Sequence, residues 1–265
     1  MPTINWNQGT INFSDEGRGT AVLLLHGFCE SMMVWDDWKE DLLEENYRVI
    51  ALDLPGFGGS DAKATSIAQM GQAVMAVCEH LGLKKGICVG HSMGGYVALE
   101  VAAAQPAWLI GLGLFHSHPF ADDEDQAKAR QKSIDFIERN GHVHYVKQLI
   151  PRLFAQRTGT SASFRRDMLI LRASRSGSAA IVTAIKAMAR RMDHSKTLKR
   201  FGRPVLFING ARDPIYTTRQ RQDQLALAAV SDVHILERTG HMGMIEEKQT
   251  TQRAVRQFVR FCEEW

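Results

Sequence analysis

The chain has 265 residues, of which 45% are hydrophobic and 23% charged, a composition typical of a soluble globular protein. No apolar run approaches the ~20 residues of a membrane span, and the N-terminus lacks the basic and apolar regions of a signal peptide. The four cysteines are scattered and form no C-x-x-C pair, which favours free thiols in a reducing compartment. We therefore expect a cytoplasmic protein of one large α/β domain or two small ones, without membrane association.

The net charge of +3 is unevenly distributed along the chain. Residues 126–203 hold 18 Lys and Arg against 4 Asp and Glu. Solvated helix faces are the simpler interpretation of this excess, and a basic surface that attracts anionic substrates or an acidic carrier protein is the functional one. No G-x-G-x-x-G follows a predicted strand, and no Walker A lysine motif is present, so nucleotide binding is disfavoured. We expect no nucleic-acid partner.

The first part of the chain predicts alternating strands and helices. Short apolar runs predict strands, several of them buried on both faces, and they lie at 4–13 (a pair), 21–25, 48–54, 87–89 and 109–115. Apolar residues at spacings of three and four predict helices between the strands, at 35–42, 67–81 and 96–105. Ser31 is the expected N-cap of the first of these helices.

The alternation is interrupted after Phe115 and then resumes. Residues 121–193 have almost entirely helical patterns, with segments near 123–140, 142–155, 162–174 and 176–192. Strands at 204–209 and 233–236 follow, with helices at 220–229 and 246–263. The order predicts an α/β fold with a mostly parallel, doubly wound sheet. We assign the core to 1–116 and 196–265 and an inserted helical cap to 117–195.

The segment Gly90-His91-Ser92-Met93-Gly94 matches G-x-S-x-G. With a strand before it and a helix after it, this pattern predicts a nucleophile elbow, a sharp turn that exposes the serine oxygen. Such a turn strains the serine backbone and needs glycine where other backbone passes closely. The helix N-terminus beyond the turn favours developing negative charge. A turn between small residues without catalytic function is the simpler alternative.

Ser92, Asp213 and His241 all follow predicted strands. Because an open parallel sheet has its site at the carboxyl ends of the strands, we expect these side chains to meet there. A serine hydroxyl is a poor nucleophile at neutral pH, so His241 would accept its proton and later deliver it to the leaving group. Asp213 would fix the imidazole tautomer and stabilise its cation. The simpler roles are a turn former for Asp213 and a loop cap for His241.

With these motifs the chain resembles the α/β-hydrolases over nearly its whole length. The matching segments are His26-Gly27-Phe28, Asp53-Leu54-Pro55-Gly56-Phe57-Gly58, the elbow, the Asp213 turn and Gly240-His241. The resemblance implies that the backbone N–H groups of Phe28 and Met93 form an oxyanion hole. It also places the family's cap or lid at the helical insertion and requires no cofactor or metal.

Several other residues lie near the predicted site. We expect His91 to be structural and His26 to order the oxyanion loop through hydrogen bonds. His116 and His118 follow a core strand, so either could line the pocket, as could Met242. A metal site at the His-x-His pair lacks an apparent third ligand.

These features predict a serine hydrolase that cleaves a carboxylic ester of a small or medium substrate through an acyl-enzyme. Serine at the elbow argues against haloalkane dehalogenases and epoxide hydrolases, which carry aspartate there. Related chemistries with the same triad stay open: thioester hydrolysis on an acidic acyl carrier, carbon–carbon bond hydrolysis, cofactor-free perhydrolysis and proline-specific aminopeptidase activity. A ligand receptor of hydrolase fold is the non-catalytic alternative.

Overall fold

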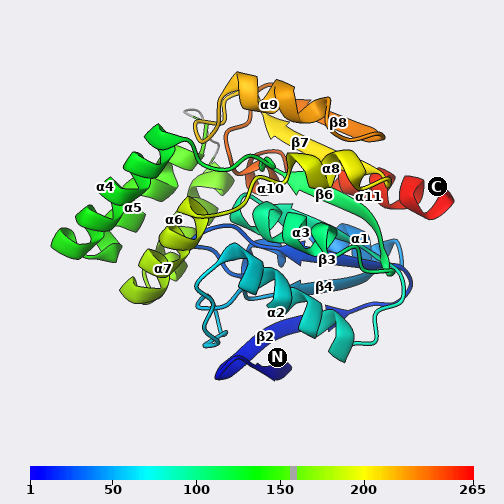
Figure 1. The fold of residues 1–265 in the computed structure, drawn as a ribbon, viewed down its shortest axis with the longest axis horizontal. Coiled ribbons are helices and arrows are strands. Elements are labelled where there is room, and N and C mark those ends of the chain that lie inside the picture. The colour runs from blue at the N-terminus through cyan, green and yellow to red at the C-terminus, as the bar shows by residue number, and fades with distance from the viewer. Residues whose placement is uncertain (156–159) are drawn as a thin grey trace.

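The sheet predicted by the apolar runs has eight strands in the order β1-β2-β4-β3-β5-β6-β7-β8 (Figure 1). A computed structural model describes residues 1–155 and 160–265 of the chain. The strands are β1 (Thr3–Trp6), β2 (Gly9–Glu16), β3 (Ala21–Leu25), β4 (Arg48–Leu52), β5 (Gly86–His91), β6 (Leu109–Phe115), β7 (Val205–Gly210) and β8 (Ser231–Leu236). The pairs β1·β2 and β2·β4 are antiparallel and all others are parallel. The predicted mostly parallel sheet is therefore confirmed.

Helices cover both faces of this sheet, and for that reason β3, β5 and β7 are buried along their whole length. On one face α3 (Met93–Ala103) packs against β5 and β6, with α2 (Ile67–His80) and α8 (Ser195–Arg200) beside it. On the other face α1 (Glu40–Glu44) and α11 (Lys248–Glu264) contact each other and the sheet. In the chain, the short helix α9 (Thr218–Leu225) precedes the last strand and the short helix α10 (Gly243–Glu246) follows it.

The helical segment between β6 and β7 forms a separate group at the left of Figure 1. It contains α4 (Glu124–Asn140), α5 (His142–Leu153), α6 (Thr160–Ala173) and α7 (Ser178–Ala189). A capping box begins α4, because the Asp123 side chain accepts from the Gln126 N–H and the Gln126 side chain accepts from the Asp123 N–H. Residues 156–159 of the expected 117–195 insertion lie outside the described residues.

One local prediction was wrong. The helix expected after Ser31 is a 3₁₀ turn (Met32–Trp35) followed by the short α1, and the Ser31 side chain caps nothing. The N–H of Met32 is bound instead by the Asp53 carboxylate of the neighbouring loop (2.8 Å), so this segment follows the tertiary contact. The helix expected at 246–263 is present as α11, and the short turn α10 precedes it.

Within the described ranges, no single helix is long and apolar enough to cross a bilayer. One bent pair, Ala162–Ala173 with Ser178–Ala189, reaches that length and apolar content only when its two arms are counted together.

Candidate active site

Ser92 lies at the sharp turn between β5 and α3, with φ 50° and ψ −114°. A non-glycine residue rarely adopts positive φ, so this backbone is strained. A Cβ on Gly90 would lie 2.2 Å from the Gly94 carbonyl oxygen, and one on Gly94 would lie 2.5 Å from the carbonyl oxygen of Leu25. The predicted strained turn and the need for glycine at both positions are confirmed.

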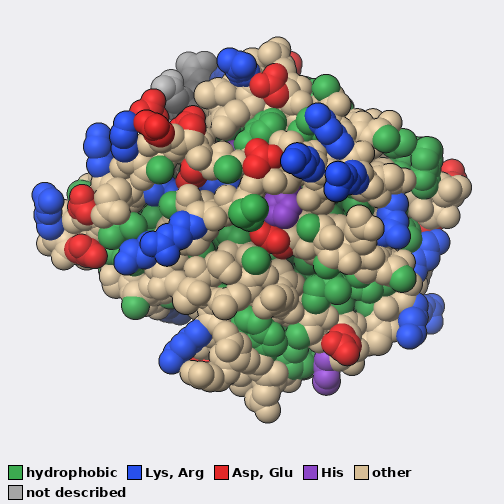
Figure 2. Space-filling view, in the orientation of Figure 1, with side chains coloured by type: hydrophobic (Ala, Val, Ile, Leu, Met, Phe, Trp, Pro, Cys, Tyr) green, Lys and Arg blue, Asp and Glu red, His purple; other side chains and the backbone are tan. Residues whose placement is uncertain are grey.

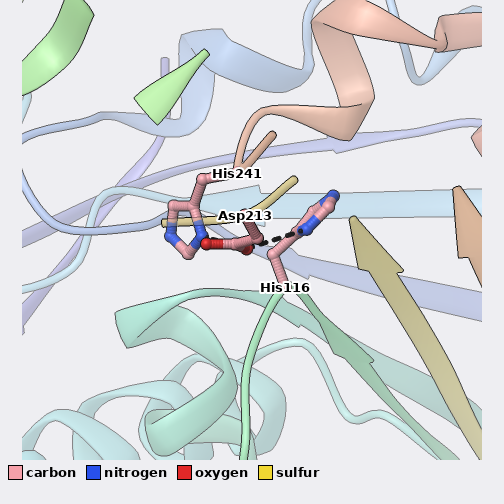
Figure 3. A group of neighbouring side chains, drawn as sticks. All are labelled: His116, Asp213 and His241. Carbon is pink, nitrogen blue, oxygen red and sulfur yellow. Dashed lines mark hydrogen bonds and ion pairs between the residues drawn. The ribbon is translucent and has the colours of Figure 1, made fainter. Parts of the chain in front are cut away.

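Asp213 and His241 meet beyond the ends of β7 and β8. Nδ1 of His241 donates to Oδ2 of Asp213 at 2.7 Å (Figure 3), and the Ile215 N–H donates to the other oxygen at 2.8 Å. Burial raises the pKa of Asp213, but the interactions with His241 and His116 outweigh it and hold this pKa well below the usual range. Asp213 is therefore ionised, and it keeps the His241 proton on Nδ1, which leaves Nε2 as the basic nitrogen.

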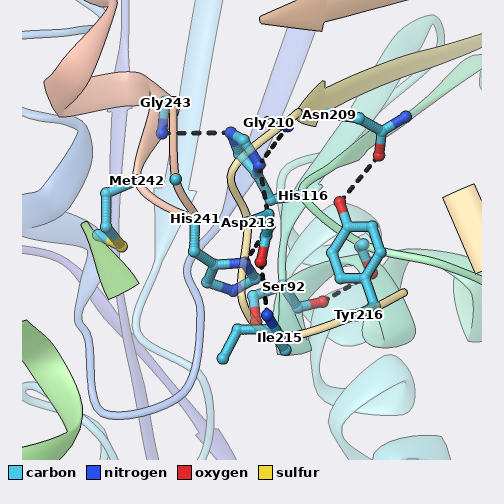
Figure 4. A network of polar contacts seen from close by, with 12 residues as sticks. Ser92, His116, Asn209, Gly210, Asp213, Ile215, Tyr216, His241, Met242 and Gly243 are labelled. Atoms are coloured by element: carbon cyan, nitrogen blue, oxygen red, sulfur yellow. Dashed lines mark hydrogen bonds and ion pairs between the residues drawn. The ribbon is translucent and has the colours of Figure 1, made fainter. Parts of the chain in front are cut away.

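His116 is a second histidine on the Asp213 carboxylate. Its Nδ1 lies 3.2 Å from Oδ2 of Asp213, and its Nε2 accepts the Gly243 N–H at 3.2 Å (Figure 4). The backbone N of Gly210 also lies 3.2 Å from Nδ1 and competes with Asp213 for this nitrogen. Because Asp213 is negatively charged, it is the stronger partner, and we assign the His116 proton to Nδ1. Burial lowers the pKa of His116 to about 4, so it donates as a neutral imidazole.

A buried ion pair joins the loops around the elbow. Oε2 of Glu30 accepts the Gly27 N–H at 2.7 Å and contacts Nδ1 of His91 at 3.1 Å. The other ring nitrogen of His91 donates to the backbone carbonyl of His241 at 2.8 Å. Burial lowers the pKa of His91, but the Glu30 charge and the hydrogen bonds outweigh it, so the net shift is upward. Because both nitrogens face acceptors, His91 is an imidazolium, and its expected structural role is confirmed.

Two backbone N–H groups near the elbow are available as donors. Met93 is the first residue of α3, so its N–H has no intrahelical partner. The Phe28 N–H forms no hydrogen bond within the described part of the chain. His26 holds this loop, because its Nε2 accepts the Leu54 N–H at 2.9 Å and its Nδ1 donates to the Gly27 carbonyl at 2.8 Å. The ordering role expected of His26 is confirmed, and the oxyanion role of the two N–H groups stays a prediction.

A cavity of about 110 Å³ lies where the strand ends face the inserted helices. Phe28, Ser92 and His241 line it from the sheet side, and Arg130 and Tyr145 line it from α4 and α5. Ser92 and His241 therefore line the same partly open space, and Figure 4 shows their side chains next to each other. Its small volume suits a short acyl group.

His116, Asp213 and His241 offer ligand atoms within 4.8 Å of one another, which is a geometry that could attract a metal ion. Two ligands about 2.0–2.2 Å from a tetrahedral Zn²⁺ lie roughly 3.3 Å apart. The 2.7 Å separation of the His241 and Asp213 atoms is shorter than this, and His116 also uses its Nε2 for a backbone hydrogen bond. The cluster fits a hydrogen-bond network better than a metal site.

The structure places the three expected pocket residues outside the lining of this cavity. His116 lies behind Asp213, and His118 stacks on Phe120 with the Tyr96 hydroxyl 3.4 Å from its Nε2. Met242 is fully buried in the loop after His241.

Sequence reasoning missed Glu30, Arg130 and Tyr145, all of which line the cavity. Glu30 had a signal, since it lies three residues after Gly27 in the oxyanion loop. Arg130 and Tyr145 had none, because their patterns are those of ordinary amphipathic helices.

Comparison with known proteins identifies the class. Residues 20–248 match the alpha/beta hydrolase fold family, and the chain belongs to it. The chain is 28% identical over 247 residues to the dihydrolipoyllysine-residue acetyltransferase component of the acetoin cleaving system of Pseudomonas putida. That match covers 91% of this chain but only 64% of the relative.

Two further similarities extend over both partners. The chain is 25% identical over 248 residues to 2-succinyl-6-hydroxy-2,4-cyclohexadiene-1-carboxylate synthase of Enterobacter sp. (strain 638), with 90% and 91% of the two chains covered. A thermophilic esterase from Thermogutta terrifontis superposes with a TM-score of 0.86 at 27% identity, with 96% of this chain and 94% of that one covered.

Proposed function

We propose that the protein is a serine hydrolase that cleaves carboxylic esters of small substrates. Ser92 is the nucleophile, His241 the general base and acid, and Asp213 the residue that orients His241. One observation carries the proposal: the Asp213–His241 hydrogen bond leaves Nε2 of His241 free beside the cavity onto which the strained Ser92 opens. The similarity to a protein named as an esterase supports the same chemistry.

In the first half-reaction, Nε2 of His241 takes the proton of the Ser92 hydroxyl as its oxygen attacks the ester carbonyl. The imidazolium that forms is stabilised by the ionised Asp213. The tetrahedral oxyanion lies between the N–H groups of Phe28 and Met93, and the N-terminus of α3 adds a favourable field. One such donor contributes about 10²–10³ in rate in comparable enzymes. Collapse of the intermediate transfers the His241 proton to the leaving alcohol and leaves Ser92 acylated.

The second half-reaction repeats these roles with water as the nucleophile. His241 deprotonates the water, the same two N–H groups bind the second oxyanion, and the acid product leaves with Ser92 reprotonated. In this proposal the inserted helices of residues 117–195 act as a cap that shields the acyl-enzyme, because α4 and α5 supply the outer wall of the cavity.

A fluorophosphonate tests the nucleophile directly. Incubation with this reagent should add one phosphonyl group to the wild-type protein, on the peptide that contains Ser92, without added metal or cofactor. The Ser92→Ala variant should stay unmodified while retaining the wild-type circular dichroism spectrum. Labelling at another serine, or none in folded wild-type protein, would contradict the proposal.

A substrate panel then identifies the bond that is cleaved. One relative is named as a carboxylate synthase and another as an acetyltransferase component, so the fold and the elbow leave the reaction open. Esters, thioesters and carbon–carbon substrates of graded acyl length should be compared, with Ser92→Ala as the blank. We expect short-chain esters to have the highest kcat/KM because the cavity is small.

Docking of an acidic acyl carrier on the basic segment stays a prediction. On the face shown in Figure 2, the Lys and Arg side chains of this region are interspersed with acidic ones. Several are paired, for example Arg165 with Asp37 and Arg166 with Asp167. The rate of hydrolysis of carrier-bound thioesters should fall with added salt, while that of small esters should not. Equal salt dependence for the two substrate classes would remove this alternative.

A further inference from the structure

Two arginines share one carboxylate beside the cavity. Nε and Nη2 of Arg130 and Nη1 of Arg191 all bind Asp122. The side chains of Asp122 and Arg191 are 1% and 3% exposed, and that of Arg130, which faces the cavity, is 23% exposed. Arg130 comes from α4, and Arg191 follows α7. The cluster therefore carries one positive charge more than Asp122 neutralises.

Arg130 presents this excess charge to the active-site cavity. Its guanidinium lines the same space as Ser92, and the acceptor of its Nη1 within the described residues is the Met188 thioether sulfur at 3.6 Å. A thioether is a weak acceptor, so strong donors remain available on Arg130. Arg191 lies behind it, with its guanidinium 4.0 Å from the centre of the Tyr96 ring.

Among the described residues, no carboxylate besides Asp122 binds Arg130. Glu30 is the one carboxylate among the described lining residues, and it is already paired with His91. Burial and then the charge of Arg191 lower the pKa of His118 to about 3, so His118 is neutral. Arg130 and Arg191 share the single charge of Asp122, and a guanidinium that faces a partly buried space gains from a further anion. Since Arg191 alone would neutralise Asp122, the presence of Arg130 favours an anion supplied by the ligand.

We propose that Arg130 is the anion-binding residue of a substrate subsite, and that the preferred substrates are small esters that carry an ionised carboxylate. This inference rests on the proposed ester hydrolysis and specifies its substrate class. The guanidinium fork binds a carboxylate with charge-assisted hydrogen bonds, which gain strength where water is excluded. The small cavity limits the substrate to a short chain between the ester and the carboxylate.

Matched ester pairs test the subsite. Monoethyl succinate and ethyl levulinate are nearly isosteric and differ in a carboxylate against an acetyl group on the acyl side. Acetoxyacetate and acetoxyacetone make the same comparison on the alcohol side. We expect the wild type to prefer the anionic member of at least one pair in kcat/KM. In Arg130→Gln this ratio should fall by about ten- to a hundredfold, the usual effect of a hydrogen bond between charged groups. Arg139→Gln, at an exposed position of the same helix, should leave the ratio unchanged.

A binding measurement separates this inference from the proposed chemistry. Ser92→Ala should bind monoethyl succinate more tightly than ethyl levulinate in calorimetry, and Arg130→Gln in that background should abolish the difference. Arg130→Lys should retain part of it, and Asp122 keeps Arg191 as a partner in both variants, which protects the fold. If binding depends on Arg130 but the wild type hydrolyses none of these esters, the hydrolase proposal alone is contradicted. Hydrolysis of both members of each pair at equal rates, unaffected by Arg130→Gln, would overturn the subsite alone.

Discussion

Replacing Glu30 by glutamine tests the buried ion pair that joins the loops around the cavity. A single oxygen, Oε2 of Glu30, serves both the Gly27 N–H and the protonated Nδ1 of His91. A glutamine can place its oxygen there, which leaves the His91 imidazolium buried without a counter-charge. It can instead place its NH₂ there, which leaves the Gly27 N–H without an acceptor. Because both arrangements break a buried interaction, we expect Glu30→Gln to lower the free energy of unfolding by about 3 kcal/mol.

Urea unfolding followed by tryptophan fluorescence measures this loss, since Trp35 and Trp38 are fully buried in the core. In thermal unfolding, the midpoint temperature of Glu30→Gln should fall by roughly 6–12 °C for a chain of this size. Glu45→Gln is the matched control, because Glu45 pairs with Arg260 at the surface and its side chain is 35% exposed. That variant should lose less than about 1 kcal/mol. If Glu30→Gln costs no more than Glu45→Gln, the buried ion pair has been assigned wrongly.

The same pair gives a pH dependence with a definite sign. The pKa of His91 is raised in the fold, so its contribution to stability is complete below the unfolded value of 6.5 and is lost as pH rises through the folded value. The pKa of Glu30 is lowered, so its contribution is lost only at acid pH. Wild-type stability should therefore decline from pH 6.5 upward more steeply than that of Glu30→Gln. Equal slopes would show that His91 is not charged in the folded state.

Three further predictions concern the proposed triad, the buried His118 and the close approach of Gly210 to the loop before His241. Asp213→Asn should lower kcat by about 10³–10⁴ without unfolding the protein, because an amide favours the wrong imidazole tautomer; a loss below tenfold in steady-state assays would refute the triad. The pKa of His118 is lowered from 6.5 to about 3, so the unfolded chain binds more protons and stability is lost as the pH is lowered through that window. His118→Gln should flatten this acid slope in urea titrations. A Cβ at Gly210 would lie 2.0 Å from the Gly240 carbonyl oxygen, so Gly210→Ala should cost about 1–3 kcal/mol. Gly177→Ala, with nothing within 4 Å, should stay within about 0.5 kcal/mol of the wild type by the same titration.

The strands could be predicted because a strand that is buried on both faces of the sheet has a short, continuous apolar sequence. The runs at 21–25 and 109–115 match β3 and β6. The helix after Ser31 was not predictable, because the backbone there is bound by Asp53, which is close only in the folded chain. The six-residue α8 is too short to display a helical period.

Site residues were predictable where the backbone imposes a local rule. The elbow needs its glycines and its serine at fixed positions, so Ser92 could be identified as a candidate from residues 90–94 together with the strand and helix that flank them. Asp213 and His241 could be placed because each follows a strand of a parallel sheet. The residues of the cavity wall could not be predicted in this way. Arg130 lies on a helix whose sequence permits many packings, and its environment depends on Arg191 and Asp122 from other segments.

Sheet order explains why a histidine follows β6. The strands β5, β6, β7 and β8 are consecutive in the sheet, and Ser92, His116, Asp213 and His241 follow them in the same order. Neighbouring strands lie about 4.8 Å apart, so Ser92 and Asp213 are separated by the full width of β6. His116 occupies that gap and donates to Asp213 from the side opposite His241, with its own orientation fixed by the Gly243 N–H. A larger or charged side chain there would displace Asp213 or compete for its charge. A neutral imidazole fills the space and leaves the carboxylate directed at His241, which lines the cavity.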